Sequence, residues 1–401
     1  MVSDGQALEI PAGFRAGGVR AGIKPSGAPD VAVIVADSTC SAAGTFTTNR
    51  IAAAPVQWDR ALVPSEAIRA IVVNSGNANA ATGAQGIANV RRTAEIAADR
   101  LGCLPEQILI ASTGVIGRQL PMDRLEVGVR AALDAATDTP EGFRAASEAI
   151  LTTDTRPKVV SLRRKTETGK TIRLLGIAKG AAMIGPRMAT MLGFLLTDAR
   201  VQMGTLTGIL SEAVEETFNC ISVEGHTSTN DSVLMLAGSR GDLPLRGADL
   251  QLFSGMVREA CEGLARMIPD DGEGATHLIT VEVRGCRDRD QARTIARAVA
   301  DSPLVKTAIH GADPNWGRIV SAAGYAGVMF DEEELSLDLD GVPLYRDGAP
   351  VDFDAARVSD RIKNNREVTI TLTLKRGDAS IRFWTCDLTA EYVRLNADYT
   401  T

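Results

Sequence analysis

A short apolar run at residues 191–196 constrains the fold of this 401-residue chain more than any other feature. It directly follows a segment that contains glycine and proline, and its length and composition predict a β-strand buried on both faces. Such a strand requires layers of structure packed against both sides of its sheet. Strand-like and helix-like segments alternate irregularly along the rest of the chain. This order predicts a mixed α/β fold of α+β layers and not a regular βαβ winding.

Hydrophobic periodicity locates the other expected elements. In the first half, strands are expected at 31–36, 68–73 and 108–111, and helices at 84–101, 122–136 and 140–151. A turn at 74–79 (NSGNAN) should end the second of these strands. Further along, a two-stranded hairpin is expected between 159 and 178, and helices at 204–218 and 250–267. The remainder is predicted to be β-rich, with strands at 279–283, 335–339 and 368–374 and a single helix at 291–300.

Charge, cysteine and histidine content exclude several functional classes. The chain has 43 basic and 50 acidic residues, a net charge of −7, which argues against nucleic acid as a partner. No apolar run reaches the roughly 18 residues of a membrane span, and no secretory signal is visible at the N-terminus. Six cysteines without a CxxC pair indicate reduced thiols in a cytoplasmic protein. With only three histidines, a His-rich metal site is not expected.

Thr190 stands at the head of the apolar run, directly after GPRMA at 185–189. An enzyme with an N-terminal nucleophile would place its threonine at such a position. Cleavage of the Ala189–Thr190 bond would free an α-amine beside the hydroxyl, and its unperturbed pKa near 8 suits a general base. The simpler alternative is that Thr190 only begins a strand, since threonine favours strands.

Two glycine-containing loops are candidates for binding an anion. STGVIG at 112–117 follows a strand, and its glycines permit the unusual φ values that let consecutive N–H groups converge into an oxyanion hole. The alternative is an ordinary turn between a strand and a helix. NSGNAN at 74–79 has the same ambiguity, because its amide side chains can bond a ligand or only their own turn.

Other polar segments contain charged groups for which the sequence allows either a binding or a structural role. Glu273, between two glycines in DDGEGAT at 270–276, could pair a cationic amine or lie in a solvated loop. Lys179 is flanked by glycine and could equally be a surface lysine. Capping and turn hydrogen bonds explain most clusters like EGHTSTND at 224–231.

Four separate segments, taken together, resemble the ornithine acetyltransferase family of arginine biosynthesis. They are KGAAMIGPRMATML at 179–192, STGVIG at 112–117, GADPNWGR at 311–318 and DLTAEYVRLNADYTT at 387–401. The similarity implies an α/β fold related to self-processing amidases, in a precursor that cleaves itself between Ala189 and Thr190. The products would be an alpha fragment, 1–189, and a beta fragment, 190–401, with a smaller β-rich C-terminal subdomain at about 280–390. Two copies of each fragment would form a heterotetramer.

The resemblance also implies a reaction. The acetyl group of N2-acetylornithine would pass to glutamate by a ping-pong mechanism through an acetyl ester on Thr190. No cofactor is implied, although acetyl-CoA remains open as an alternative donor. The matching oxyanion-hole residues are Thr113 and Gly114. The matching substrate contacts are Thr152 or Thr153, Lys179, Thr190, Glu273, Asn396 and Thr401. Chemically, Lys179 is suited to the substrate α-carboxylate, and Glu273 to the δ-ammonium of ornithine or to positioning the attacking amine.

Some positions depart from the family pattern. Ala182 stands where glycine is common, Glu224 and His226 where aspartates are common, and Ala312 where glutamate is common. None of them replaces a matched catalytic residue. Two alternatives to the transferase remain: an amidohydrolase or aminopeptidase-like enzyme of the same fold, and a non-catalytic protein that retains the scaffold.

Overall fold

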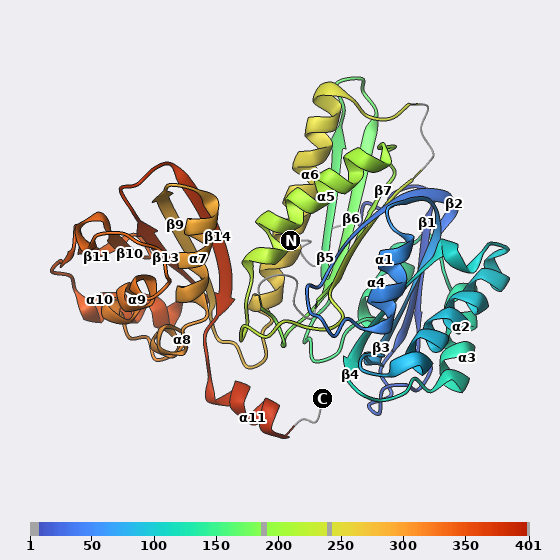
Figure 1. The fold of residues 1–401 in the computed structure, drawn as a ribbon, viewed down its shortest axis with the longest axis horizontal. Helices are drawn as coiled ribbons and strands as arrows, with labels where there is room; N and C mark the ends of the chain where they lie inside the picture. Colours follow the sequence, from blue (N-terminus) through green and yellow to red (C-terminus); the bar gives the residue numbers. More distant parts are fainter. Residues whose placement is uncertain (1–7, 186–190, 239–242, 399–401) are drawn as a thin grey trace.

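The computed structural model describes residues 8–185, 191–238 and 243–398, which form two β-sheets with helices packed against them (Figure 1). Within these ranges, one sheet has eight strands and the other has six. The mixed α/β class predicted from the sequence is confirmed. In the part of the chain that the structure describes, no helix is both long enough and apolar enough to cross a membrane.

The eight-stranded sheet has the order β4-β3-β2-β8-β7-β6-β5, with β1 paired to β2. Its strands are β1 (Phe14–Val19), β2 (Val31–Phe46), β3 (Ser65–Asn77), β4 (Ile108–Val115), β5 (Lys158–Lys165), β6 (Thr171–Lys179), β7 (Leu192–Thr197) and β8 (Ser232–Ala237). The long strand β2 joins two halves of this sheet. Its residues 31–35 pair with β3, as do Cys40 and Ala42 after shifts in register, and its residues 41–46 pair with β8. Side chains from both halves meet in one shared core, so the halves face each other.

The alternation of side chains along the strands explains this layering. In β2, Val31 and Val33 pack with the helices on the outer face, whereas Ala32 and Ile34 point into the core between the halves. All six residues of β7 are buried. This confirms the strand that the apolar run predicted, buried on both faces.

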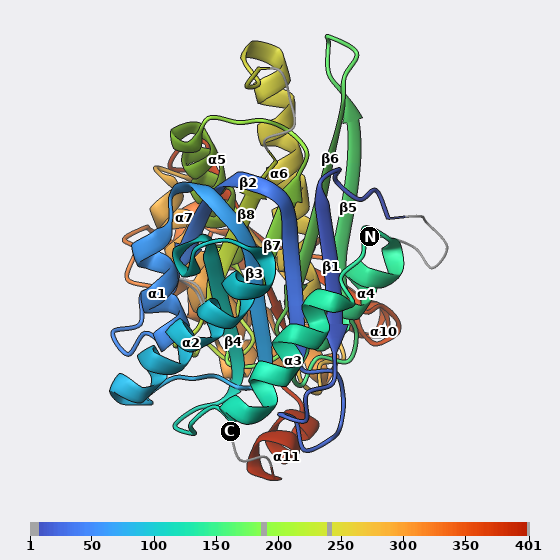
Figure 2. The same ribbon diagram turned by 90° about the vertical axis from the view of Figure 1, so that its right-hand side faces the viewer.

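Helices cover the outer faces of both halves (Figure 2). They are α1 (Ala54–Leu62), α2 (Gly83–Leu101), α3 (Met122–Asp134), α5 (Met203–Glu216) and α6 (Gly247–Asp270). The helix α4 (Pro140–Ala149) instead packs into the core that the two halves share. Short 3-10 turns lie at Pro105–Gln107, Phe218–Cys220 and Glu332–Glu334. The five helices predicted between 84 and 267 are all present, with ends within a few residues of the expected ones. Gly102 caps α2 in the left-handed conformation at φ 64°, as its position in the sequence indicates.

The second sheet has the order β12-β11-β10-β13-β9-β14. Its strands are β9 (Leu278–Cys286), β10 (Ser336–Leu339), β11 (Val342–Arg346), β12 (Ala349–Pro350), β13 (Glu367–Thr373) and β14 (Ala379–Cys386). Its helices are α7 (Arg289–Ala300), α8 (Pro303–His310), α9 (Trp316–Gly324) and α10 (Ala355–Asn364). After β14 the chain leaves this sheet, and α11 (Ala390–Asp398) lies below the space between the two sheets (Figure 1).

Two sequence-based expectations were wrong. The C-terminal part contains α8 to α11 besides the single helix predicted at 291–300. These helices are only 8 to 10 residues long, and side-chain caps such as Ser302 and Asp354 stabilise their starts, so periodicity is a weak signal for them. The expected turn at 74–79 also begins too early, because β3 continues to Asn77 through its pairing with β4. The sequence analysis also missed α1 and the strands β1, β8, β11, β12 and β14 altogether.

Candidate active site

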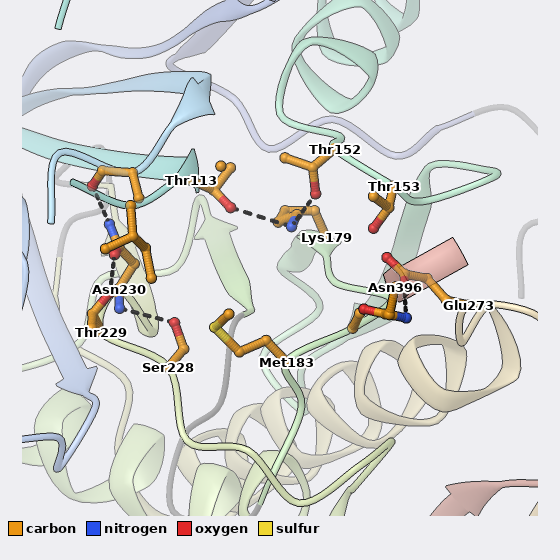
Figure 3. A pocket seen from close by; sticks show the side chains of 14 residues that line it. Thr113, Thr152, Thr153, Lys179, Met183, Ser228, Thr229, Asn230, Glu273 and Asn396 are labelled. Atoms are coloured by element: carbon orange, nitrogen blue, oxygen red, sulfur yellow. Dashed lines mark hydrogen bonds between the residues drawn. The ribbon is translucent and has the colours of Figure 1, made fainter. Parts of the chain in front are cut away.

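A cavity of about 110 Å³ opens where the ends of several strands meet the loops before β7 and after α6. Its lining draws on segments from residue 78 to residue 396 (Figure 3). Every described residue that the sequence matched to a catalytic or substrate role lines it: Thr113, Gly114, Thr152, Thr153, Lys179, Glu273 and Asn396. Ala189, the proposed nucleophile Thr190 and the C-terminal Thr401 lie outside the described residues. The tertiary fold thus gathers the predicted positions into one small site.

Lys179, at the end of β6, places a cation against the cavity. It is buried, with 2% of its surface exposed, so the alternative of a surface lysine is wrong. Its Nζ donates to Thr152 Oγ1 at 2.7 Å and to Thr113 Oγ1 at 3.3 Å (Figure 3). Burial lowers the pKa of Lys179, and the Asp154 carboxylate opposes that shift.

A buried ionic cluster holds this lysine in place. Asp154 Oδ2 lies 3.8 Å from Lys179 Nζ, and Asp154 Oδ1 accepts from Gly180 N at 2.6 Å and from Lys158 Nζ at 2.7 Å. Lys158 also donates to Asp271 Oδ2 at 2.6 Å. Burial by itself raises the pKa of the Asp154 carboxyl, but the Lys179 and Lys158 cations outweigh it and hold the pKa well below its usual range. The sequence analysis did not identify Asp154 or Lys158. Their contact with each other spans only four residues, but their other partners, Lys179 and Asp271, are distant in the chain.

Thr113 and Gly114 form the end of β4, beside the parallel strand β3. Gly114 has a φ of 129°, and a Cβ there would lie 2.4 Å from the carbonyl carbon of Gly76. Only glycine permits both this conformation and this close approach. The segment is therefore the end of a paired strand rather than an ordinary turn to a helix, and its backbone borders the cavity as an oxyanion hole requires.

Glu273 and Asn396 form the opposite wall. Asn396 Nδ2, on α11, donates to Glu273 Oε2 at 2.8 Å (Figure 3). The Glu273 backbone is fixed because its N–H donates to Ala181 O at 3.0 Å. Glu273 is half-buried at the cavity rather than on a fully solvated loop. An acidic group thus lies across the cavity from the buried lysine.

The remaining wall comes from Ser228, Thr229 and Asn230, in the segment whose polarity was attributed to capping and turn bonds. Its residues do make such bonds, but Asn230 also donates to Ala78 O and Ser112 O, which are distant in the chain. Of the four departures from the family pattern, Ala182 lines the cavity. Burial raises the pKa of Glu224 to about 8.

The comparisons with known proteins agree with this geometry. Residues 15–401 match the ArgJ family. The chain belongs to the ArgJ family. It is 44% identical to the arginine biosynthesis bifunctional protein ArgJ of Rhodopirellula baltica, over 98% of this chain and 96% of that protein. The protein of the same name from Thermus thermophilus is 46% identical, over 98% of this chain and all of that protein.

A crystal structure of an ArgJ bifunctional protein from Bacillus halodurans is also similar to this ArgJ-family chain. It has 40% sequence identity and a TM-score of 0.50. The match covers 98% of that crystallised chain but only 51% of this one. The crystallised chain is therefore about half as long as this chain, whereas the two relatives named above extend along all of it.

Proposed function

We propose that this protein is a self-cleaving glutamate N-acetyltransferase that transfers the acetyl group of N2-acetylornithine to glutamate, producing ornithine and N-acetylglutamate for arginine biosynthesis. One observation carries the proposal. In a chain of the ArgJ family, a buried Lys179 and an acidic Glu273 line the same cavity as the backbone of Thr113 and Gly114. The site therefore offers a cation for an α-carboxylate, an anion for an ammonium group and donors for an oxyanion.

The reaction proceeds in two similar halves. The Thr190 hydroxyl attacks the acetyl carbonyl, and the free α-amine of Thr190 takes its proton. N–H donors at Thr113 and Gly114 stabilise the negative charge on the tetrahedral intermediate. Ornithine then leaves with that proton, and an acetyl ester remains on Thr190. The amine of glutamate attacks this ester in the second half, which frees the Thr190 hydroxyl again.

Self-cleavage at Ala189–Thr190 is supported by the backbone leading to that bond. Met183 has a φ of 57°, an uncommon value for a residue other than glycine. The carbonyl of Ile184 accepts from the N–H groups of Val223, Glu224 and Gly225 at 2.8, 3.3 and 3.1 Å. A Cβ on Gly185 would lie 2.5 Å from the Gly225 carbonyl carbon. The approach to the scissile bond is thus held tightly, which favours attack by a neighbouring hydroxyl.

Further parts of the proposal concern assembly and partners. The half-length crystallised chain from Bacillus halodurans supports fragments 1–189 and 190–401. We propose that two copies of each form a heterotetramer in the cytoplasm. The reaction needs no cofactor, and acetyl-CoA is a possible second donor to the same threonine. Membership of the ArgJ family favours acetyl transfer over the aminopeptidase-like alternative.

Mass spectrometry of the purified protein tests the proposal. The wild-type chain should appear as two fragments divided between Ala189 and Thr190, and Thr190→Ala should remain whole. Incubation of the wild type with N-acetylornithine should then add one acetyl group to the fragment that begins with Thr190. An uncut wild type that transfers acetyl at full rate contradicts self-cleavage. Release of free acetate at a rate insensitive to glutamate contradicts the transferase.

A further inference from the structure

Asn230 and Asp231 are consecutive buried residues that connect the two halves of the eight-stranded sheet. They directly precede β8, and neither is required by the chemistry proposed above. Each has a side chain bonded to a different part of the proposed site. Together they link the strand of the oxyanion hole to the strand that follows the nucleophile.

Asn230 holds the backbone beside the oxyanion hole. Its Nδ2 donates to Ser112 O at 2.8 Å and to Ala78 O at 2.6 Å, and its Oδ1 accepts from Thr229 Oγ1 at 2.7 Å. Ser112 directly precedes Thr113. Both amide hydrogens of Asn230 are thus used to fix β4 and the segment after β3.

Asp231 holds the backbone beside the nucleophile. Its Oδ1 accepts from Met191 N at 2.8 Å, and that nitrogen is covalently bonded to the carbonyl carbon of Thr190. Ser232 N also donates to Met191 O at 3.3 Å, and Asp231 O accepts from Thr47 N at 3.0 Å. The backbone on both sides of this contact is therefore fixed.

The Asp231 side chain is unusual for a structural acceptor. It is 0% exposed, and among the described residues its Oδ2 has no hydrogen-bond partner. Burial raises the pKa of this carboxyl well above its usual range, although the hydrogen bond from Met191 N–H and the Lys179 cation oppose the shift.

We propose that Asn230 and Asp231 are a pair of positioning residues that set the spacing between Thr190 and the oxyanion hole. The inference rests on the proposed function, because it assumes that Thr190 is the nucleophile. The two residues are adjacent in the chain, directly before β8, and their side chains bind the backbone on both sides of the reacting centre. Neither side can therefore shift without breaking a buried hydrogen bond. Misplacement of a reacting group by about 1 Å can reduce a rate about a hundredfold.

Substitutions at Asp231 distinguish the contribution of its hydrogen-bond acceptor from that of its acidic group. Asp231→Asn retains an acceptor for Met191 N–H, whereas Asp231→Leu has a similar size and none. We expect Asp231→Leu to slow both self-cleavage and kcat by about a hundredfold with KM changed little. Asp231→Asn should restore most of both rates. The proposal is overturned if Asp231→Leu matches the wild type, or if Asp231→Asn is as slow as Asp231→Leu.

Asp59 on α1 provides a matched control. It is also 0% exposed, its Oδ1 accepts from Ile110 N at 2.8 Å, and its Oδ2 has no described partner, but it does not line the cavity. Asp59→Leu should lower the Tm by an amount similar to Asp231→Leu but with a much smaller loss of kcat per folded molecule, because its bond is to Ile110, three residues before Thr113 on β4. Equal losses of kcat per folded molecule in the two variants would reduce Asp231 to a merely structural role and overturn the proposal.

Asn230→Asp provides a second arm that does not depend on Asp231. The variant has nearly the same shape but lacks both donors to Ser112 O and Ala78 O, and it should also lower kcat more than it changes KM. If Asp231→Leu is insoluble, Asn230→Asp tests the proposal alone, and wild-type rates in Asn230→Asp overturn it.

The wild type distinguishes failure of the proposed function from failure of the positioning role. If it neither cleaves nor accepts acetyl, the proposed function fails; if it does both while the variants match it, only the positioning role fails.

Discussion

Lys179 at the first sheet and Lys306 at the second are both buried, as is Lys158, but the surroundings of Lys179 and Lys306 differ. Lys179, at the end of β6, donates to two threonine hydroxyls that line an open cavity. Lys306, on α8, donates to Thr385 Oγ1 at 2.9 Å and to the Cys386 carbonyl, and it lies away from that cavity. Both are almost fully buried, with 2% and 3% of their surfaces exposed. We therefore propose that Lys179 serves substrate binding and Lys306 serves structure, and that the adjacent cavity lined with polar groups distinguishes the two.

The largest expected effect comes from exchanging each lysine for methionine. Lys179→Met should lower kcat/KM by about 10²- to 10³-fold, because a buried charge partner of the substrate carboxylate is lost. Lys306→Met should instead cost about 1–3 kcal/mol of stability by leaving the Cys386 carbonyl without its donor, with kcat/KM per folded molecule near that of the wild type. Steady-state kinetics and denaturant unfolding measure the two quantities. A large loss of kcat/KM in both variants would contradict the distinction between a binding lysine and a structural one.

A smaller effect is expected from a pair of glycines with positive φ, one in each sheet. Gly114→Ala should lower kcat about a hundredfold, because its Cβ would displace β4 from β3 and misalign the donors to the oxyanion. Gly285 at φ 75° is equally crowded, since a Cβ there would lie 1.9 Å from Leu374 O. Gly285→Ala should cost about 1–3 kcal/mol in backbone strain without changing kcat per folded molecule. If Gly114→Ala and Gly285→Ala have the same kcat per folded molecule, Gly114 has no part in the oxyanion hole.

The smallest expected effect concerns a histidine cluster beside the second sheet. Asp387 Oδ2 lies 3.2 Å from His277 Nδ1 and 3.1 Å from His310 Nδ1, and its other oxygen accepts from the N–H groups of Thr276 and His277. The hydrogen bond to Asp387 raises the pKa of His277, and burial opposes that shift. The resulting stability is present below the ordinary His pKa of about 6.5 and is lost as the pH rises through the higher folded-state value.

Asp387→Asn tests this pH dependence. The variant should lose about 1.5–3 kcal/mol at pH 6, since it removes hydrogen bonds to a charged group, and it should lose less at pH 8. The pKa of Asp387 itself lies well below its usual range: burial alone would raise it, but its hydrogen bonds to His277 and Thr276 prevail, so its own contribution is lost only in acid. Thermal melts at both pH values measure the difference. An equal loss of Tm at pH 6 and pH 8 would show that the histidine charge contributes nothing.

Much of this architecture was predictable from the sequence. The strand at β7, the hairpin of β5 and β6, and the long helices follow from local periodicity, since each depends on neighbouring residues. Thr113, Gly114, Lys179, Glu273 and Asn396 were found through the resemblance of their motifs to a family. From composition and spacing alone, each of these segments also had a simpler explanation as a turn, a loop or a surface side chain.

Tertiary structure decided which distant polar groups meet. Lys158 and Asp271 are 113 residues apart in the chain, and Asn230 is 118 residues from Ser112, so no local pattern marks either contact. A charged or amide group is stable inside a protein only when a partner compensates for its lost hydration, and the fold alone brings such partners together. The sequence by itself therefore determined the class of fold and the family, and it predicted the individual site positions. Only the tertiary structure showed that Lys179 is buried, that Asn230 bonds to Ser112 and that Asp231 bonds to Met191.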